Sequence, residues 1–381
     1  MNRTIPSGEK SGISIFLLVL ILALRSGALV AQIMPLTLEP DGGNKKASVS
    51  EQLGIVEIEI NYNRPGVKGR EGKIWGTNVA HYGFKDLGHG TGYAVPWRAG
   101  ANENTTISFS HPVRINDLNL PAGKYGFFIC LGQQNDTLIF SKVNNSWGSF
   151  YYDSSFDALR VPVSHENVDS SVEWLNYEFE KQSDSTVDIA LTWEKRKISF
   201  TVRADTKALQ MEAFESGFRT TRPYYDFLSA IYWCVRNDYG LDKALEWADR
   251  AIYFRVMGEK NFRTLQAKAI VLYKLDRANE ALNLMKEALP MGTMQEVHFY
   301  GRQLIGYGMN ENALEIFKFN YDRYPNELYT HVGMARAYSA AGNYKKALDY
   351  LNKARPLAAS DFDKTDLYSK IDTLSKNMDI N

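Results

Sequence analysis

The sequence predicts a multidomain α+β protein in which an all-β antiparallel sandwich, or a barrel, precedes an all-α domain of helical repeats. From about Val49 to Arg203 apolar residues recur at every second position, for example at Val56, Ile58 and Ile60, which is the period of a half-buried strand. After Arg203 the apolar period becomes that of helices and a sequence motif repeats. A chain of 381 residues also exceeds what one small core accommodates.

Further strands follow from the same alternation. Apolar side chains alternate at 125–131, at 187–193 and at 198–202, and turn-forming stretches such as LPAGKYG at 120–126 separate such segments. Many short strands with no long helical pattern between them are typical of an antiparallel sandwich or barrel.

Four segments of the second half align with one another: DKALEWADRAI, NEALNLMKEAL, ENALEIFKFNY and KKALDYLNKAR. Their alanines are Ala244, Ala281, Ala313 and Ala347, which are spaced by 37, 32 and 34 residues. This pattern resembles the tetratricopeptide repeat, a helix-turn-helix unit of about 34 residues. Small residues are needed where the two helices of a pair cross closely. The segment at 361–376 is predicted to be a closing helix, which an open stack needs for solubility.

The amino terminus carries the pattern of an export signal. Arg3 and Lys10 precede an apolar run that ends at Leu24, and small residues follow, so that cleavage after Ala28 or Ala31 fits the pattern. The apolar run would form about 20 Å of helix, short of a ~30 Å bilayer core. An uncleaved membrane anchor is the alternative. We therefore expect a signal peptide at 1–31 and no membrane span after its removal.

The remaining boundaries follow from the two periods. We expect a β-sandwich domain at 36–205, a linker at 206–223 and helical repeats with a closing helix at 224–378. The two cysteines, Cys130 and Cys234, fall in different domains, and the sequence leaves open whether they pair. Basic and acidic residues balance at 44 each, and this balance argues against nucleic acid as a partner.

Several separated motifs of the β half together resemble the DUF2911 family, a domain of unknown function. They are YNRPGVKGREGKIWG at 62–76, PWRAGANENTTISFS at 96–110, LPAGKYGFF at 120–128, SWGSFYY at 146–152 and DALRV at 157–161. The resemblance covers nearly all of residues 36–203 and implies an exported protein of a Gram-negative bacterium: periplasmic, envelope-associated or secreted. It brings no established activity. The chain departs from the family between Trp75 and Trp97, where its loop is longer and richer in glycine.

The polar residues just before one predicted strand are a candidate ligand site. Trp97, Arg98, Asn102 and Glu103 lie close together in sequence, and an arginine beside an aromatic face suits a carboxylate, a phosphate or a sugar. The alternative is structural: Arg98 pairs with Glu103 to satisfy its charge while Trp97 packs in the core.

The glycine-rich loop adds His81 and His89, with Lys85 and Asp86 between them. Two imidazoles and a carboxylate could contribute to a zinc site, but the spacing is loose and no helix fixes it. We expect neither a metal nor another cofactor, and include His81 and His89 in the candidate ligand site.

The sequence holds no recognisable catalytic motif. We therefore expect a non-catalytic binding protein whose β domain takes a small molecule or glycan and whose repeats dock a protein partner. The alternative is an envelope hydrolase acting on a glycan or ester, with Arg98 and Glu103 in a polar pocket beside the His81 and His89 loop.

Overall fold

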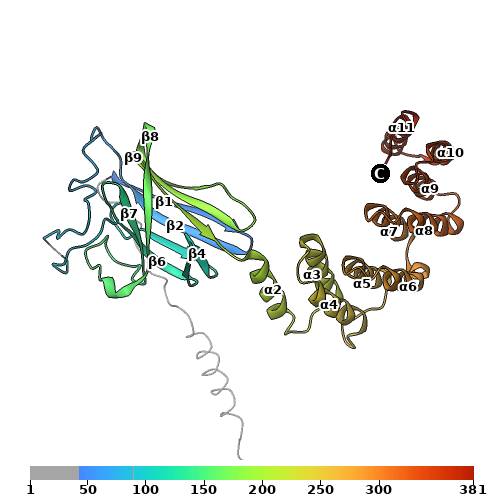
Figure 1. Cartoon of the computed structure of the whole chain (residues 1–381), viewed down its shortest axis with the longest axis horizontal. Coiled ribbons are helices and arrows are strands. Elements are labelled where there is room, and N and C mark those ends of the chain that lie inside the picture. Colours follow the sequence, from blue (N-terminus) through green and yellow to red (C-terminus); the bar gives the residue numbers. More distant parts are fainter. Residues whose placement is uncertain (1–42, 89) are drawn as a thin grey trace, which may run out of the picture. The chain divides into compact units, whose positions relative to one another are not determined.

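The computed structural model describes residues 43–88 and 90–381. The chain divides after Ala204 into two compact units, a β unit and a helical unit (Figure 1). The predicted signal peptide at 1–31, with its cleavage sites, lies outside the described residues. Within the described part of the chain, none of the helices is both long and apolar enough to cross a membrane. Cys130 and Cys234 are free thiols, one in each unit.

The β unit is a nine-stranded antiparallel sheet, which confirms the all-β prediction. The strand order is β1-β2-β3-β6-β7-β8-β9-β4-β5. The strands are β1 (Lys45–Leu53), β2 (Val56–Arg64), β3 (Thr106–Phe109), β4 (Val113–Ile115), β5 (Leu118–Leu120), β6 (Gly123–Cys130), β7 (Asn135–Ser141), β8 (Asp157–Glu180) and β9 (Thr186–Arg203).

The sheet folds over on itself through the long strand β8. The first part of β8 pairs with β7 and its second part pairs with β9. In a flat sheet, β6 and β9 would be three strand spacings apart, about 14 Å. The ring centroids of Phe127 on β6 and Phe200 on β9 are only 5.8 Å apart, and Tyr62 on β2 meets Tyr177 on β8 at 4.7 Å. The sheet therefore forms two facing layers with an aromatic core between them.

The helical unit consists, within the described residues, of ten α-helices. They are α2 (Thr206–Gly217), α3 (Tyr224–Asn237), α4 (Leu241–Tyr253), α5 (Phe262–Lys274), α6 (Ala278–Ala288), α7 (Met294–Gly306), α8 (Asn310–Arg323), α9 (Leu328–Ala340), α10 (Tyr344–Ala354) and α11 (Asp361–Ser375). Residues 206–223, predicted as a linker, hold helix α2. Phe214 and Phe218 of this segment pack their rings edge-on against Trp247 of α4, so the segment is part of the helical unit.

The repeats are four helix pairs, α3/α4, α5/α6, α7/α8 and α9/α10, and α11 follows them as the predicted closing helix (Figure 1). The four alanines of the sequence motif each lie on the second helix of a pair and are fully buried. The first helices of successive pairs also touch, α3 with α5, α5 with α7 and α7 with α9. They form a continuous layer along the stack.

Helices α7, α8 and α9 approach closely because two glycines face one aromatic ring. A Cβ on Gly301 of α7 would lie 2.7 Å from Phe317 Cζ, and a Cβ on Gly333 of α9 would lie 2.5 Å from Phe317 Cδ1. Phe317 is a residue of α8 and is 1% exposed. Its ring has no space to retreat into in a close-packed interior.

We predict that Gly333→Ala destabilises the helical unit by up to about 2 kcal/mol. The new methyl group overpacks the Phe317 ring at a cost of about 1–3 kcal/mol, and the higher helix propensity of alanine offsets ~1 kcal/mol of this cost. Thermal unfolding of the full chain, followed by far-ultraviolet circular dichroism, measures it. Gly306→Ala is the matched control on α7, since no atom lies within 4 Å of the added Cβ; it should leave stability unchanged or higher. An equal effect of both substitutions would contradict the packing argument.

Candidate functional site

Trp97, the first residue of the predicted ligand site, belongs to the core of the β unit. Its side chain is 3% exposed. The ring stacks on that of Trp193 of β9 at 6.3 Å with an interplanar angle of 7°, and meets Trp75 edge-on at 5.6 Å. Trp97 therefore packs between other tryptophans and offers no open face to a ligand.

Arg98 and Glu103 bind different partners. The Arg98 guanidinium donates from Nη1 to the Asn102 carbonyl oxygen at 2.9 Å, and its Cζ lies 4.8 Å from the centre of the Phe150 ring. Burial lowers the pKa of Arg98. Glu103 accepts a hydrogen bond from Asn63 Nδ2 at 2.6 Å, and its other oxygen lies 3.5 Å from Lys46 Nζ. The Arg98–Glu103 ion pair, which was the structural alternative to a ligand site, is thus absent, and the two side chains take part in separate contacts.

The other predicted residues are spread around this region. Asn102 accepts a hydrogen bond from Asn44 Nδ2 through its side-chain oxygen at 3.1 Å. His81 is 6% exposed, burial lowers its pKa, and its Nδ1 has no hydrogen-bond partner within the described part of the chain. His89 lies outside the described residues. Among the residues that are described, no three His, Cys, Asp or Glu side chains gather closely enough to hold a metal ion; with His89 outside, the expectation of no metal stays a prediction.

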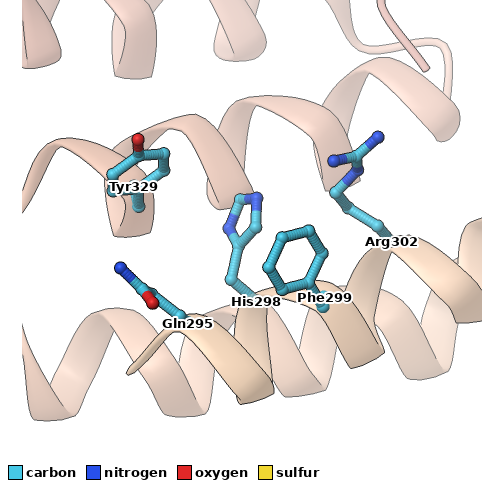
Figure 2. A pocket seen from close by; sticks show the side chains of 5 residues that line it. All are labelled: Gln295, His298, Phe299, Arg302 and Tyr329. Carbon is cyan, nitrogen blue, oxygen red and sulfur yellow. The ribbon is translucent and has the colours of Figure 1, made fainter. Parts of the chain in front are cut away.

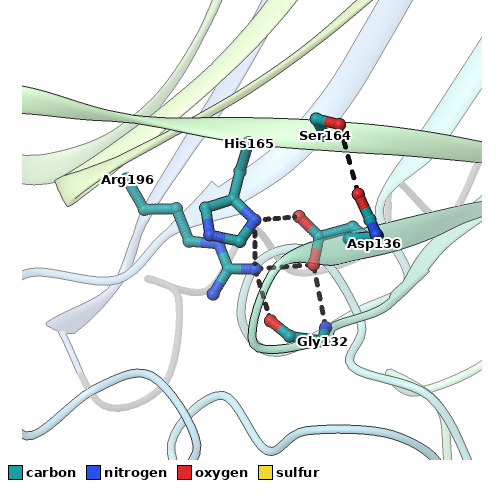
Figure 3. A network of polar contacts seen from close by, with 6 residues as sticks. Gly132, Asp136, Ser164, His165 and Arg196 are labelled. Carbon is teal, nitrogen blue, oxygen red and sulfur yellow. Dashed lines mark hydrogen bonds and ion pairs between the residues drawn. The ribbon is translucent and has the colours of Figure 1, made fainter.

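A buried polar network in the β unit was missed by the sequence analysis (Figure 3). Asp136 of β7 accepts hydrogen bonds through Oδ1 from Arg196 Nη2 at 2.6 Å and from the Gly132 amide at 2.9 Å. Its Oδ2 lies 3.1 Å from Nδ1 of His165 on β8. The Arg196 guanidinium also stacks over Trp75, 5.1 Å from the ring centre.

This network ties three strands together, because Asp136, His165 and Arg196 come from β7, β8 and β9. The Asp136 side chain is fully buried and that of Arg196 is 4% exposed. A buried charge must be paired and hydrogen-bonded; here the two charges are paired through Arg196 Nη2, while Arg196 Nε has no hydrogen-bond partner among the described residues. In the sequence both residues stand among polar neighbours, QQND and EKRK, and so resemble surface charges.

The helical unit holds a cavity between α7 and α9, with a volume of about 210 Å³ (Figure 2). We call it the α7–α9 groove; its lining residues are Gln295, His298, Phe299, Arg302 and Tyr329. Figure 2 shows the first four projecting from α7 and Tyr329 facing them from α9. Phe299 is 60% exposed and Tyr329 is 44% exposed, so two aromatic side chains stand at the surface beside a hollow.

The electrostatics of the groove are set by arginines. The pKa of His298 is lowered to about 4, first by burial and then by the positive charges of Arg336 and Arg302. Nδ1 of His298 has no hydrogen-bond partner within the described residues. The floor of the groove is therefore a neutral imidazole at pH 7, and the positive charge of the groove comes from Arg302 in its lining. The sequence signal was available, since Phe299 and Arg302 lie three residues apart on one helix face.

The pKa of His298 predicts a pH dependence of stability. The folded pKa of about 4 lies below the ordinary ~6.5, so the unfolded chain binds this proton more readily. This difference in pKa contributes about 3 kcal/mol to the free energy of unfolding. The contribution is fully present above pH ~6.5 and is lost as the pH falls toward 4. Urea unfolding between these pH values should show that the free energy of unfolding falls less steeply with decreasing pH in His298→Gln than in the unsubstituted chain. His111→Gln, which alters an imidazole bonded to Ser110 and outside the groove, is the matched control: a slope for His298→Gln no shallower than that of the control would contradict the prediction.

We predict that the Asp136 network stabilises the β unit. Asp136→Ala leaves the Arg196 guanidinium buried without its carboxylate, at a cost of about 3–5 kcal/mol. Urea unfolding monitored by tryptophan fluorescence measures this loss. Lys46→Ala removes one partner of the exposed Lys46–Glu103 contact and is expected to cost at most about 1 kcal/mol. A cost for Asp136→Ala as small as that of the control would show that the network contributes little.

Comparison with known proteins finds a family match for the β unit. Residues 44–202 match the family model described as a protein of unknown function, DUF2911. No curated protein matches the chain. Several solved repeat structures are similar to the helical part, at identities that carry no functional conclusion.

One is YrrB, a TPR protein with an unusual peptide-binding site, at 21% identity over 39% of this chain and 74% of that chain, with a TM-score of 0.27. A putative kinesin light chain from Podosopora anserina, with nearly identical TPR-like repeats, has 13% identity over 42% and 89%, with a TM-score of 0.31. A tetratricopeptide repeat protein from Parabacteroides merdae has 18% identity over 44% and 67%, with a TM-score of 0.30. The resemblance seen in the sequence is confirmed: residues 44–202 match the DUF2911 family model, and tetratricopeptide-like helix pairs follow them.

Proposed function

We propose that the protein is a non-catalytic binding protein whose helical unit holds a segment of a partner protein in the α7–α9 groove. The observation that carries the proposal is the combination of Phe299 and Tyr329 exposed beside a 210 Å³ hollow with Arg302 at its edge. Exposed aromatic and arginine side chains supply most of the binding energy at protein interfaces.

The size and charge of the groove favour a protein segment over a small molecule. Small-molecule sites are usually ~300–1,000 Å³ and enclose most of the ligand, whereas the groove is smaller and open at the surface. A hollow of this size accommodates one or two side chains of a bound peptide. Arg302 has no hydrogen bond or ion pair within the described residues, and its guanidinium lies 5.9 Å from the Phe299 ring centre. A peptide carboxylate is a natural partner for it.

In this proposal the chain is exported, as its first 31 residues predict, and works in the envelope of a Gram-negative bacterium, as the resemblance to DUF2911 implies. The β unit would take a small molecule or glycan, as the sequence led us to expect. Two loops support such a role, the one before Trp97 and the one that holds Phe150, because their residues Tyr93 and Tyr151 are 74% and 60% exposed. The loops are joined by a hydrogen bond from the Thr91 amide to the Phe150 carbonyl oxygen at 3.0 Å.

The hydrolase alternative has no supporting observation. It requires Arg98 and Glu103 in one polar pocket, and these side chains make separate contacts, with the Asn102 carbonyl and with Asn63. We therefore propose the binding function alone.

The proposal predicts that Phe299→Ala and Arg302→Ala each weaken peptide binding at least tenfold, about 1.4 kcal/mol. The probes are peptides selected on the full chain from a phage-displayed random library, with affinities measured by isothermal titration calorimetry. Phe362→Ala is the control, because Phe362 is 77% exposed on α11 and is not part of the groove. A library that yields no binder, or binders that tolerate both groove substitutions, would rule out the groove as the binding site.

A further inference from the structure

The segment after α11 turns back onto α9. Asp379 accepts a hydrogen bond through Oδ1 from Ser339 Oγ at 2.5 Å. The Ile380 amide donates to the same Ser339 hydroxyl at 3.1 Å. One side chain of α9 thus binds both an acidic side chain and the backbone of the next residue, and Ser339 is 2% exposed beneath them.

Arg336, one helical turn before Ser339, binds the next two residues of the segment. Its Nη1 donates to the Ile380 carbonyl oxygen at 2.8 Å and to Asn381 Oδ1 at 3.4 Å. In return Asn381 Nδ2 donates to the Arg336 carbonyl oxygen at 3.1 Å. We call Asp379–Asn381 the tail. Helix α9 recognises it through main chain and side chain, as a binding protein recognises an extended peptide.

The tail reaches a second cavity, which adjoins the α7–α9 groove. This cavity has a volume of about 410 Å³ and is lined by Asn381 together with residues of α7 and α9: Phe299, Arg302, Gln303, Ile305, Gly306 and Arg336. Phe299 and Arg302 line both hollows. The tail therefore lies at the edge of the surface that we propose for a partner segment.

The charge of the second cavity favours an acidic occupant. Arg302 and Arg336 both line this cavity, and the residue with which the tail lines it is Asn381, whose side chain is a neutral amide. Burial lowers the pKa of Arg336 and the charge of Arg302 lowers it further, while the charges of Asp366 and Asp379 act in the opposite direction. A carboxylate in place of that amide would gain a charge-assisted hydrogen bond, which is roughly twice as strong as a neutral one.

We infer that this second cavity accepts an extended peptide with an aspartate or glutamate side chain directed at Arg336 and Arg302, and that the tail occupies part of it in competition with that peptide. The inference rests on the proposed function and names the chemistry of the partner segment. A tethered segment has an effective concentration in the mM range. Even weak binding of the tail would therefore reduce the apparent affinity for a peptide added in trans.

The test compares the full chain with a chain that ends at Asn377. The probe is a synthetic peptide with the sequence of residues 373–381 and blocked ends, titrated by calorimetry. We expect it to bind the shortened chain about tenfold more tightly than the full chain. A second peptide with aspartate in place of the residue corresponding to Asn381 should bind the shortened chain more tightly still. No binding to the shortened chain, or equal binding to both chains, would overturn the inference, as would weaker binding of the aspartate peptide.

The variant Asp379→Ala in the full chain tests the same inference if the shortened chain does not fold. It removes the acceptor for Ser339 from an exposed residue, keeps the chain length, and should raise the affinity for the blocked peptide in the same direction. Arg336→Gln in the shortened chain should abolish the preference for the aspartate peptide. The two proposals can fail separately: library peptides that need Phe299 but bind both chains equally would support the groove and exclude the tail as a competitor, whereas library peptides that tolerate Phe299→Ala would exclude the groove.

Discussion

The helical unit depends on the contact of the Phe317 ring with two glycine backbones. Because Gly301 and Gly333 carry no side chain, the ring fills the space between α7 and α9. His298 packs against the same ring, with centroids 5.4 Å apart, and is buried with it. The next residue, Phe299, then points outward, since consecutive residues of a helix face different directions. The groove is the outer consequence of this packing: the buried contact sets the spacing of α7 and α9, and the exposed residues between them form the walls.

The β unit uses its polar side chains differently. Asp136 and Arg196 form hydrogen bonds with one another and with the Gly132 backbone. Arg98 and Glu103 form hydrogen bonds with loop residues and with Asn63 of β2. In the helical unit, by contrast, Arg302 makes no hydrogen bond or ion pair among the described residues, and Phe299 beside it is exposed. Charge that is satisfied within the fold stabilises it or closes its loops, whereas charge beside an open hollow is available to a ligand. This difference leads us to place the protein-binding function in the helices.

Periodicity was sufficient to predict the architecture. The alternation at Val56, Ile58 and Ile60 became the buried face of β2, and the recurring alanines became the crossing points of helix pairs. Arg98 and Glu103 do not pair, and the reason is local. Ala99 and Asn102 both adopt positive φ, 49° and 54°, so the backbone turns twice between Arg98 and Glu103 and sends their side chains to different neighbours. Proximity in sequence does not imply a shared pocket where the backbone enters the left-handed region.

The second cavity, which adjoins the α7–α9 groove, escaped the sequence analysis because overall charge conceals local charge. The chain has 44 basic and 44 acidic residues, yet Arg302 and Arg336 line one cavity and lie close enough for each charge to affect its surroundings. Helical spacing alone cannot bring these two residues together, because they belong to different repeats. The stacking of α7 on α9 does so, and the same stacking places the tail beside them. A positive surface that already binds an asparagine and an aspartate of its own chain is chemically suited to an acidic peptide. It binds such a peptide only to the extent that the tail dissociates from it.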